Sequence, residues 1–236
     1  MRRYRWIMAG GRGIDSAWSY DHGGYGLSQR QMGIAIKESG VPRSELFITT
    51  KIPVSSNVSA ADGTIEYDLT QLMVAHVDLL LIHTPGKSSK DIATTWSAME
   101  AALAAGKTRA IGVSNFVTSD LETLLTTAKV VPAVNQISLS IGKVDNDTVS
   151  YCKFNNITVE AYSPLGHTGA PVLKNAAVKK IASAHRKSPA SVALRYVVQS
   201  GHTFVTASGE TDYDKEDLDI FDWSLTASEM HTLDSQ

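Results

Sequence analysis

The sequence predicts an α/β fold built around parallel strands, and it favours a closed (β/α)8 barrel of the TIM type. Short apolar segments alternate along the 236 residues with longer segments of helical pattern. The apolar segments start 23 to 44 residues apart, which is the spacing expected where a helix connects two parallel strands. Reactive side chains stand at the ends of successive strands, and this second observation favours the barrel.

Seven segments are predicted as strands, at residues 13–15, 46–51, 77–83, 110–114, 133–138, 158–162 and 202–206. The third is almost continuously apolar, as expected for a strand of a parallel sheet that is buried on both faces. Helices are predicted at residues 27–39, 91–105, 119–128 and 188–199. Gly106 suits the C-terminal cap of the second helix, and Ser188 suits the N-terminal cap of the fourth.

The carboxyl ends of six predicted strands carry polar or reactive residues: Asp15, Lys51, His83, Ser114, Asn115, Gln136 and Tyr162. In a barrel these ends meet on one face, where active sites are built. The alternative is an open dinucleotide-binding sheet, which is expected to carry G-x-G-x-x-G after its first strand. The glycines at positions 10, 11 and 13 and at 23, 24 and 26 do not fit that spacing, which weakens the open-sheet alternative without removing it.

Composition excludes several classes of protein. The 22 Lys and Arg residues nearly balance the 24 Asp and Glu residues, so neither nucleic acid nor an anionic membrane is an expected partner. The single cysteine, Cys152, excludes an internal disulfide framework or a multi-cysteine metal site. No apolar run approaches the roughly 18 residues of a membrane span. We expect one domain, residues 1–236, located in the cytoplasm and without a metal.

Three of these strand-end residues, Asp15, Lys51 and His83, form a coherent site for carbonyl reduction together with Tyr20. A free phenol, with a pKa of about 10, is a poor acid near neutral pH. A nearby ammonium favours the phenolate, and a carboxylate beside the ammonium keeps it charged. A neutral imidazole can orient a carbonyl oxygen by a hydrogen bond. Each residue alone has an ordinary structural explanation, but the set would require four coincidences.

The order and spacing of several motifs resemble the aldo-keto reductase family from about residue 6 to residue 233. The motifs begin at Gly11 (GRGIDSAWSY), Leu46 (LFITTK), Asp78 (DLLLIHTP), Gly106 (GKTRAIGVSNF), Val134 (VNQ) and Ala161 (AYSPLG). The resemblance implies a (β/α)8 barrel and hydride transfer from NADPH to an aldehyde or ketone. It assigns the catalytic roles to Asp15, Tyr20, Lys51 and His83, with Tyr20 as the general acid.

The resemblance also implies the cofactor-binding residues. Ser114, Asn115 and Gln136 match positions that hold the nicotinamide carboxamide, and Tyr162 matches an aromatic side chain that stacks on the ring. Ser163, Leu165 and Gly166 match a loop along the pyrophosphate. Helix capping by Ser114 and Asn115, and an ordinary rim position for Tyr162, are the structural alternatives.

The residues expected near the 2′-phosphate depart from the family pattern. Ser208 and Glu216 match it, but Ala207 and Tyr213 stand where basic residues are usual. A phosphate gains most from charge-assisted contacts, whereas the neighbouring aspartates are negative. We therefore expect NADPH from the resemblance and NADH as a possible cofactor on physical grounds.

The ends of the chain also differ from the family pattern, so we expect a shortened member. The first barrel strand has no counterpart, which leaves seven strands where closure needs eight. A long C-terminal loop has none either, and Thr84 stands where the family often has Trp. The sequence therefore does not identify the carbonyl substrate.

Two other functions remain open at this stage. The chain could be a catalytically weak or inactive nicotinamide-binding or regulatory protein of the same fold. A phosphate-binding barrel enzyme of unrelated chemistry is less favoured, because the segment after the last predicted strand has a single glycine and an acidic residue. The expected partner of the enzyme is a small carbonyl compound, and we expect a monomer unless the strand edges left by the missing strand cause self-association.

Overall fold

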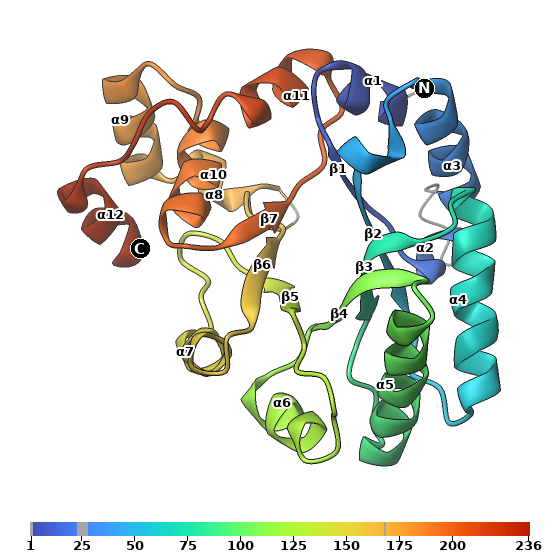
Figure 1. Cartoon of the computed structure of the whole chain (residues 1–236). Coiled ribbons are helices and arrows are strands. Elements are labelled where there is room, and N and C mark those ends of the chain that lie inside the picture. The colour runs from blue at the N-terminus through green and yellow to red at the C-terminus, as the bar shows by residue number, and fades with distance from the viewer. Residues whose placement is uncertain (1, 23–27, 168) are drawn as a thin grey trace. The chain divides into compact units, whose positions relative to one another are not determined.

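Strands and helices alternate along the chain as the sequence predicts (Figure 1). The computed structural model describes residues 2–22, 28–167 and 169–236. All seven predicted strands are present, each within two residues of its expected bounds. They are β1 (Gly13–Asp15), β2 (Phe47–Ile52), β3 (Val77–Ile82), β4 (Thr108–Ser114), β5 (Val134–Ser138), β6 (Thr158–Tyr162) and β7 (Thr203–Val205).

The chain forms two compact units, and each is described by itself. Unit 1 contains residues 1–135 and 154–157, and unit 2 contains residues 136–153 and 158–236. In both units the strands are neighbours in chain order. Strand β5 begins in unit 1 and ends in unit 2.

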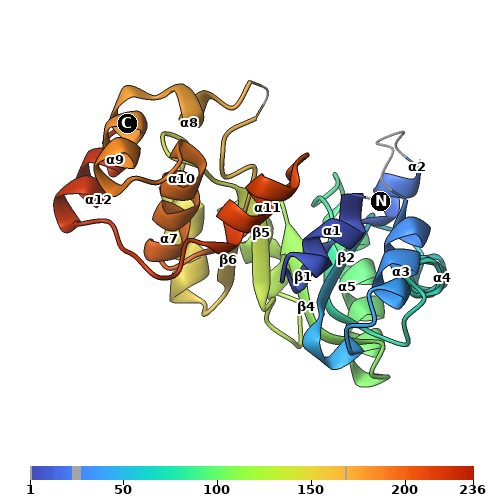
Figure 2. The ribbon, with the colours of Figure 1, turned by 90° about the horizontal axis from the view of Figure 1, so that it is seen from above.

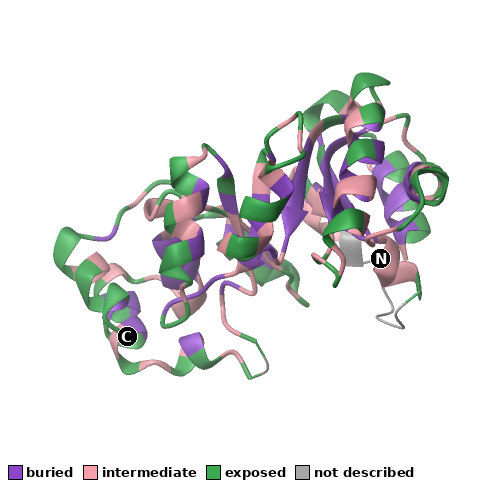
Figure 3. Cartoon of the chain, turned by 90° about the horizontal axis from the view of Figure 1, so that it is seen from below, coloured by how far each residue is buried: buried purple, intermediate pink, exposed green. Residues whose placement is uncertain are grey.

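The sheet of unit 1 is parallel and follows the order β1-β2-β3-β4. Asp15 is paired with Thr49, and Lys51 with Leu81, in the register of these strands. Every residue of β3 is buried, which confirms the prediction of a strand covered on both faces. Figure 3 shows the same burial along the strands of this unit. The buried strands therefore give the residues at the carboxyl edge of the sheet a support that excludes water.

Helices cover one face of this sheet. The long helices are α3 (Gln29–Glu38), α4 (Val58–Leu72) and α5 (Ser89–Ala104), and α1 (Arg2–Met8) packs beside α3 (Figures 1 and 2). The shorter elements of unit 1 are α2 (Trp18–His22), η1 (Arg43–Glu45) and α6 (Thr118–Leu125). A Cβ atom added to Gly33 of α3 would lie 2.6 Å from the backbone oxygen of Gln71 in α4. The absence of a side chain at Gly33 therefore allows α3 and α4 to approach closely.

Short polar side chains cap the starts of several helices. Asn57 accepts hydrogen bonds from the backbone amides of Ser59 and Ala60 at the start of α4, and Ser88 accepts one from Asp91 at the start of α5. These residues satisfy amides that have no partner inside the helix. Gly106, with φ of 72°, follows α5 as predicted.

Unit 2 contains a parallel pair and six helices among its described residues. Strand β6 pairs with β7, and Tyr162 lies opposite Val205. The helices are α7 (Asn146–Phe154, whose last residue belongs to unit 1), α8 (Pro171–Lys174), α9 (Ala176–His185), α10 (Pro189–Gln199), α11 (Thr211–Leu218) and α12 (Ala227–Asp234). Ser188 caps α10 through the amide of Ser191 at 3.1 Å, as predicted. Cys152 is buried in α7.

Within the described residues, α1 is the element that precedes β1, and no strand lies before it. The described helices also include none that is both long enough and apolar enough to cross a membrane.

Candidate functional site

Three of the four predicted catalytic residues come from the carboxyl edge of the sheet in unit 1. Asp15 ends β1, Lys51 is the next-to-last residue of β2, and His83 directly follows β3. The fourth, Tyr20, lies in the short helix α2. The helical turn of α2 holds Tyr20 beside the two strand ends.

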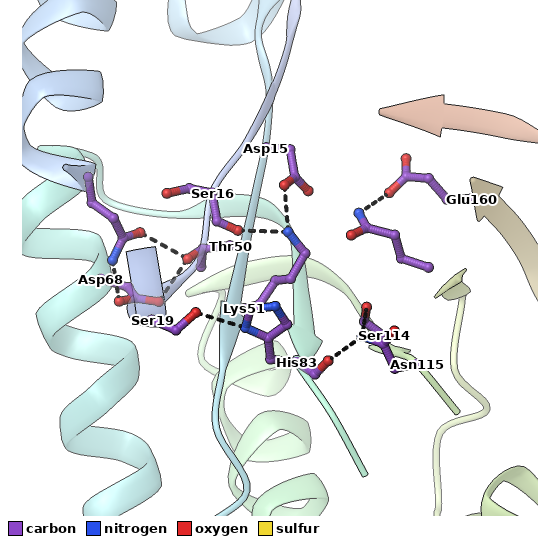
Figure 4. A network of polar contacts seen from close by, with 12 residues as sticks. Asp15, Ser16, Ser19, Thr50, Lys51, Asp68, His83, Ser114, Asn115 and Glu160 are labelled. Carbon is purple, nitrogen blue, oxygen red and sulfur yellow. Dashed lines mark hydrogen bonds and ion pairs between the residues drawn. The ribbon is translucent and has the colours of Figure 1, made fainter. Parts of the chain in front are cut away.

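Lys51 is the central contact of this group. Its ammonium donates hydrogen bonds to Asp15 Oδ1 at 2.5 Å and to the backbone oxygen of Ser16 at 2.9 Å (Figure 4). The side chain is 1 % exposed. The same nitrogen lies 5.3 Å from the centre of the Tyr20 ring, and the two side chains share a hydrogen bond. Lys51 therefore connects the carboxylate of Asp15 to the phenol of Tyr20.

The charge of Lys51 is stabilised despite its burial. Burial alone lowers the pKa of a lysine, because the charged form loses its hydration. The attraction of Asp15, together with the contact to Tyr20, outweighs this effect and raises the pKa of Lys51 above its ordinary value. The ammonium form therefore persists at neutral pH next to the phenol.

His83 is the fourth member of the group and also contacts Tyr20. The two rings meet edge to face, with centroids 5.9 Å apart. Burial, together with the nearby charge of Lys51, lowers the pKa of His83 to about 4. The imidazole is therefore neutral near pH 7. In this form one ring nitrogen donates a hydrogen bond and the other accepts one.

Ser19 is a contact of this group that the sequence did not reveal. Its hydroxyl lies 3.1 Å from Nδ1 of His83, and it fixes the orientation of the ring. Ser19 precedes Tyr20 in α2, so its adjacency to the predicted acid was the available signal. The sequence alone does not show that the short helix turns this hydroxyl toward His83.

Ser114 and Asn115 follow at the end of β4 in the same unit. The Asn115 side chain donates hydrogen bonds to the backbone oxygen of His83 at 2.9 Å and to the Ser114 hydroxyl at 3.1 Å. Asn115 has a φ of 62°, a left-handed conformation that asparagine tolerates better than most residues. Six predicted site residues of unit 1 are thus connected through β1 to β4 and α2.

The remaining predicted site residues belong to unit 2. Gln136 of β5 donates a 2.7 Å hydrogen bond to Oε1 of Glu160 in β6. Tyr162 lies two residues after Glu160, and its ring meets that of His167 edge to face at 5.9 Å. The sequence analysis did not identify Glu160. Its position in β6, on the same side of the strand as Tyr162, was the signal that could have found it.

The loop after β6 forms a tight turn. The backbone amide of Gly166 donates a 2.9 Å hydrogen bond to the oxygen of Ser163, with Leu165 half-buried between them. Both Ser163 and Gly166 have positive φ values, 53° and 85°. A Cβ atom at Gly166 would lie 2.7 Å from Pro171. The turn therefore depends on a glycine at this position.

The residues predicted near the 2′-phosphate lie around helix α11. The hydroxyl of Ser208 contacts the carboxylate of Asp214, which is buried. Asp217 is also buried, and its pKa is raised to about 6 by burial and by the charges of Asp214 and Glu216. Ala207, Tyr213 and Glu216 are exposed. The structure thus pairs Ser208 with Asp214, a residue that the family pattern does not single out.

The side chains described by the structure contain no group of three or more His, Cys, Asp or Glu residues placed to hold a metal ion.

Comparisons with known proteins agree with this description. The sequence model of the Aldo/keto reductase family matches residues 4–236. Glyoxal reductase of Bacillus subtilis is 38% identical over 231 residues, covering 97% of this chain and 80% of the relative.

Solved structures show the same fold. An aldo-keto reductase from a deep-sea metagenome library aligns with a TM-score of 0.93 and 31% identity, covering 99% of this chain and 84% of that one. An aldo-keto reductase of Bombyx mori in complex with NADP aligns with a TM-score of 0.89 and 30% identity, covering 99% and 81%. These alignments confirm the predicted (β/α) barrel class of fold. The chain therefore belongs to the aldo/keto reductase family of oxidoreductases.

Proposed function

We propose that this protein reduces an aldehyde or ketone to an alcohol with a nicotinamide cofactor, and that Tyr20 is the general acid. The observation that carries the proposal is the buried ammonium of Lys51, which contacts both Asp15 and Tyr20. A cation that is buried beside a phenol stabilises the phenolate that remains when the phenol gives up its proton.

Each residue of the group has one task in this reaction. Neutral His83 donates a hydrogen bond to the carbonyl oxygen and orients it toward Tyr20. Tyr20 then transfers its proton to that oxygen as negative charge develops on it. Lys51 stabilises the resulting phenolate, and Asp15 holds the ammonium in place. Ser19 positions the His83 ring through its contact with Nδ1.

Reduced nicotinamide supplies the hydride that adds to the carbonyl carbon when the cofactor is bound. The side chains suit such a group, because hydroxyl and amide groups of Ser114, Asn115 and Gln136 match a carboxamide. The flat ring of Tyr162 is suited to stacking on a flat heterocycle. We assign Ser163, Leu165 and Gly166 to the pyrophosphate, and Ser208 and Glu216 to the adenosine end. Binding of NADP by the Bombyx mori relative supports this assignment.

The choice between NADPH and NADH follows from the charges around α11. The first turn of this helix contains Asp212 and Asp214, and its basic residue, Lys215, is in the last turn. Carboxylates beside Ser208 repel a phosphate dianion. We therefore propose that the protein uses both cofactors and binds NADPH less tightly than relatives with basic residues at these positions.

A direct assay tests the reaction. The purified protein is given NADPH or NADH and a reactive aldehyde, 4-nitrobenzaldehyde, and the loss of cofactor absorbance is followed. Tyr20→Phe should lower kcat by a factor of about 100 to 10,000, the range of a lost acid catalyst. Tyr151→Phe in α7 of unit 2 is the matched control and should retain wild-type turnover. Equal turnover by Tyr20→Phe and the wild type would remove the mechanism.

A fluorescence titration with the reduced cofactors separates the enzyme from a non-catalytic cofactor-binding protein. Binding together with turnover supports the enzyme, and binding without turnover supports the regulatory alternative.

We also propose that residues 1–236 act as one barrel domain, a monomer in the cytoplasm. A single family match over residues 4–236 supports the one-domain proposal, and the molar mass in solution tests the monomer.

A further inference from the structure

Three polar side chains are buried together on the helix side of β2, next to the catalytic group. They are Gln29 at the start of α3, Thr50 of β2 and Asp68 of α4, and they are 0%, 1% and 0% exposed. Figure 4 shows Thr50 and Asp68 in contact, with Lys51 following Thr50 along the strand. Burying such groups is costly unless each is satisfied by hydrogen bonds.

The three side chains contact one another in a closed ring. Gln29 Nε2 lies 2.5 Å from Asp68 Oδ1, and Asp68 Oδ2 lies 2.8 Å from Thr50 Oγ1. Thr50 Oγ1 in turn lies 3.0 Å from Gln29 Oε1. Each of these contacts needs one hydrogen. The Gln29 amide supplies the hydrogen of its contact with Asp68. The Thr50 hydroxyl supplies the hydrogen of one of its two contacts, either with Gln29 or with Asp68.

The third hydrogen has a single available source, because a hydroxyl has one proton and the Gln29 oxygen has none. If Asp68 is ionised, the Thr50 proton must serve either Gln29 or Asp68, and one contact becomes a meeting of two acceptors. If Asp68 is protonated at Oδ2, it donates to Thr50, Thr50 donates to Gln29, and Gln29 donates to Asp68. The protonated form therefore satisfies the ring.

We propose that Asp68 carries a proton in the native protein and closes this ring, and that the ring is a positioning element for the catalytic helix α2. The charges around Asp68 agree with a neutral carboxyl. Asp21 of α2 opposes ionisation and His22 of α2 favours it, while Gln29 and Thr50 are uncharged. Tyr67, which precedes Asp68 in α4, is a further titratable group nearby, and its hydroxyl contacts Asp21. Burial is the largest effect, and the pKa of Asp68 is raised to about 7.

The ring is connected to the catalytic residues through the backbone. The amide nitrogen of Gln29 donates a 2.7 Å hydrogen bond to Oδ1 of Asp21, and Asp21 directly follows Tyr20. Thr50 directly precedes Lys51 in β2. A shift of Gln29 or Thr50 therefore moves the residues next to the proposed acid and its ammonium. When Asp68 ionises, the ring opens and the hold on α2 weakens.

A stability experiment tests the protonation without using the reaction. In Asp68→Asn the side-chain amide donates to Thr50 as the carboxyl does, so the ring is retained at every pH. The wild type should lose thermal stability relative to Asp68→Asn as the pH rises from 4 to 7, because the unfolded carboxyl has released its proton in this range while the native carboxyl keeps it. Asp62→Asn changes a half-buried carboxylate of the same helix, one that pairs with Lys107 and not with the ring, and it should show the same loss of stability with rising pH as the wild type.

Asp68→Leu distinguishes the contribution of the ring's hydrogen bonds from that of packing, because leucine fills the space without making any hydrogen bond. It should unfold at a lower temperature than both the wild type and Asp68→Asn at pH 5. If Asp68→Leu does not fold, the comparison of the wild type with Asp68→Asn still tests whether native Asp68 is protonated. A carboxyl 13C resonance that is absent from Asp68→Asn and titrates near pH 7 supports the proposal. Titration of that resonance below pH 5 overturns it.

The kinetic test rests on the proposed function. In the aldehyde assay the wild type should lose at least half of its kcat between pH 6 and 8 relative to Asp68→Asn, with the KM for the aldehyde changing less than twofold. Identical pH profiles for wild type and Asp68→Asn contradict the positioning role. If no variant turns over the aldehyde, the proposed function fails, whereas the resonance and the melting curves still decide the protonation of Asp68.

Discussion

The side-chain amide of Asn115 donates a 2.9 Å hydrogen bond to the backbone oxygen of His83. This contact connects the end of β4 to the residue that follows β3. A residue assigned to the cofactor therefore also fixes the backbone of a residue assigned to catalysis. The backbone of Asn115 is left-handed, so the position restricts both side-chain chemistry and conformation.

Substitutions of Asn115 should separate these two restrictions. Asn115→Gly loses the amide but adopts the positive φ freely, whereas Asn115→Ala loses the amide and is also strained. We expect Asn115→Ala to be less stable than Asn115→Gly by about 1 kcal/mol, and both to have a raised KM for the cofactor. Urea denaturation and steady-state kinetics measure the two effects. Equal stability of the two variants would contradict the strain argument.

The ion pair of Lys51 with Asp15 should control the stability of the site at high pH. The raised pKa of Lys51 means that its contribution is complete below about pH 10, where both native and unfolded states are protonated, and is lost as the pH rises through the native pKa. Asp15→Asn leaves a buried ammonium without its anionic partner, which costs up to about 3 kcal/mol. Denaturation at pH 7 measures the loss, and Asp147→Asn at the start of α7 is the control.

His83 should stay neutral across the usual assay range. Its pKa of about 4 lies below the ordinary value because burial and, next, the charge of Lys51 oppose protonation. Below pH 6.5 the unfolded chain binds a proton there that the native chain does not, so the free energy of unfolding falls between pH 6.5 and 4. His83→Gln should lack this component. Nitrogen NMR of the ring checks the pKa, and a protonated imidazole at pH 6 would be inconsistent with it.

Two glycines of unit 1 should respond in opposite ways to an added methyl group. A Cβ atom at Gly112 of β4 would lie 2.5 Å from the backbone oxygen of Val134, whereas one at Gly63 of α4 meets nothing within 4 Å. Gly112→Ala should lower the free energy of unfolding by 1 kcal/mol or more, about the cost of overpacking a core. Gly63→Ala should raise it by about 0.5 to 1 kcal/mol because alanine favours a helix. Denaturant midpoints measure both.

Basic residues at positions 207 and 213 should change the choice of cofactor. The double variant Ala207→Lys/Tyr213→Arg places cations where the structure has acidic neighbours, so the ratio of kcat/KM for NADPH over NADH should rise at least tenfold. Raising the salt concentration should reduce the gain, since exposed charges are screened. Ala207→Gln/Tyr213→Gln, which adds polar groups without charge, is the control. An unchanged ratio would show that the 2′-phosphate lies elsewhere.

The sequence predicted the strands and the ends of strands well for a physical reason. A buried parallel strand needs a continuous apolar run, and a reactive residue directly after such a run stands out, as Lys51 and His83 do. The ring around Asp68 could not be predicted in this way. Gln29 and Asp68 are 39 residues apart, and they meet because Gly33 lets α3 approach the backbone of α4 closely. The depth of helix packing is not visible in a periodic pattern.

The contact of Ser208 with Asp214 was missed for a related reason. The family motif identified Ser208 and Glu216 by position, but the turn before α11 brings a different acid to the hydroxyl. A motif shows which residues recur and does not show which neighbour satisfies them. Glu160 illustrates the same point, because its partnership with Gln136 depends on the pairing of two strands.

The distribution of residues between the two units suggests a practical route to redesign. The groups proposed to transfer the proton lie between positions 15 and 83, whereas the nucleotide contacts proposed for β6 and α11 lie after position 158. Chimeras that join the first half of this chain to the second half of another reductase would exchange nucleotide preference while keeping the acid and its ammonium.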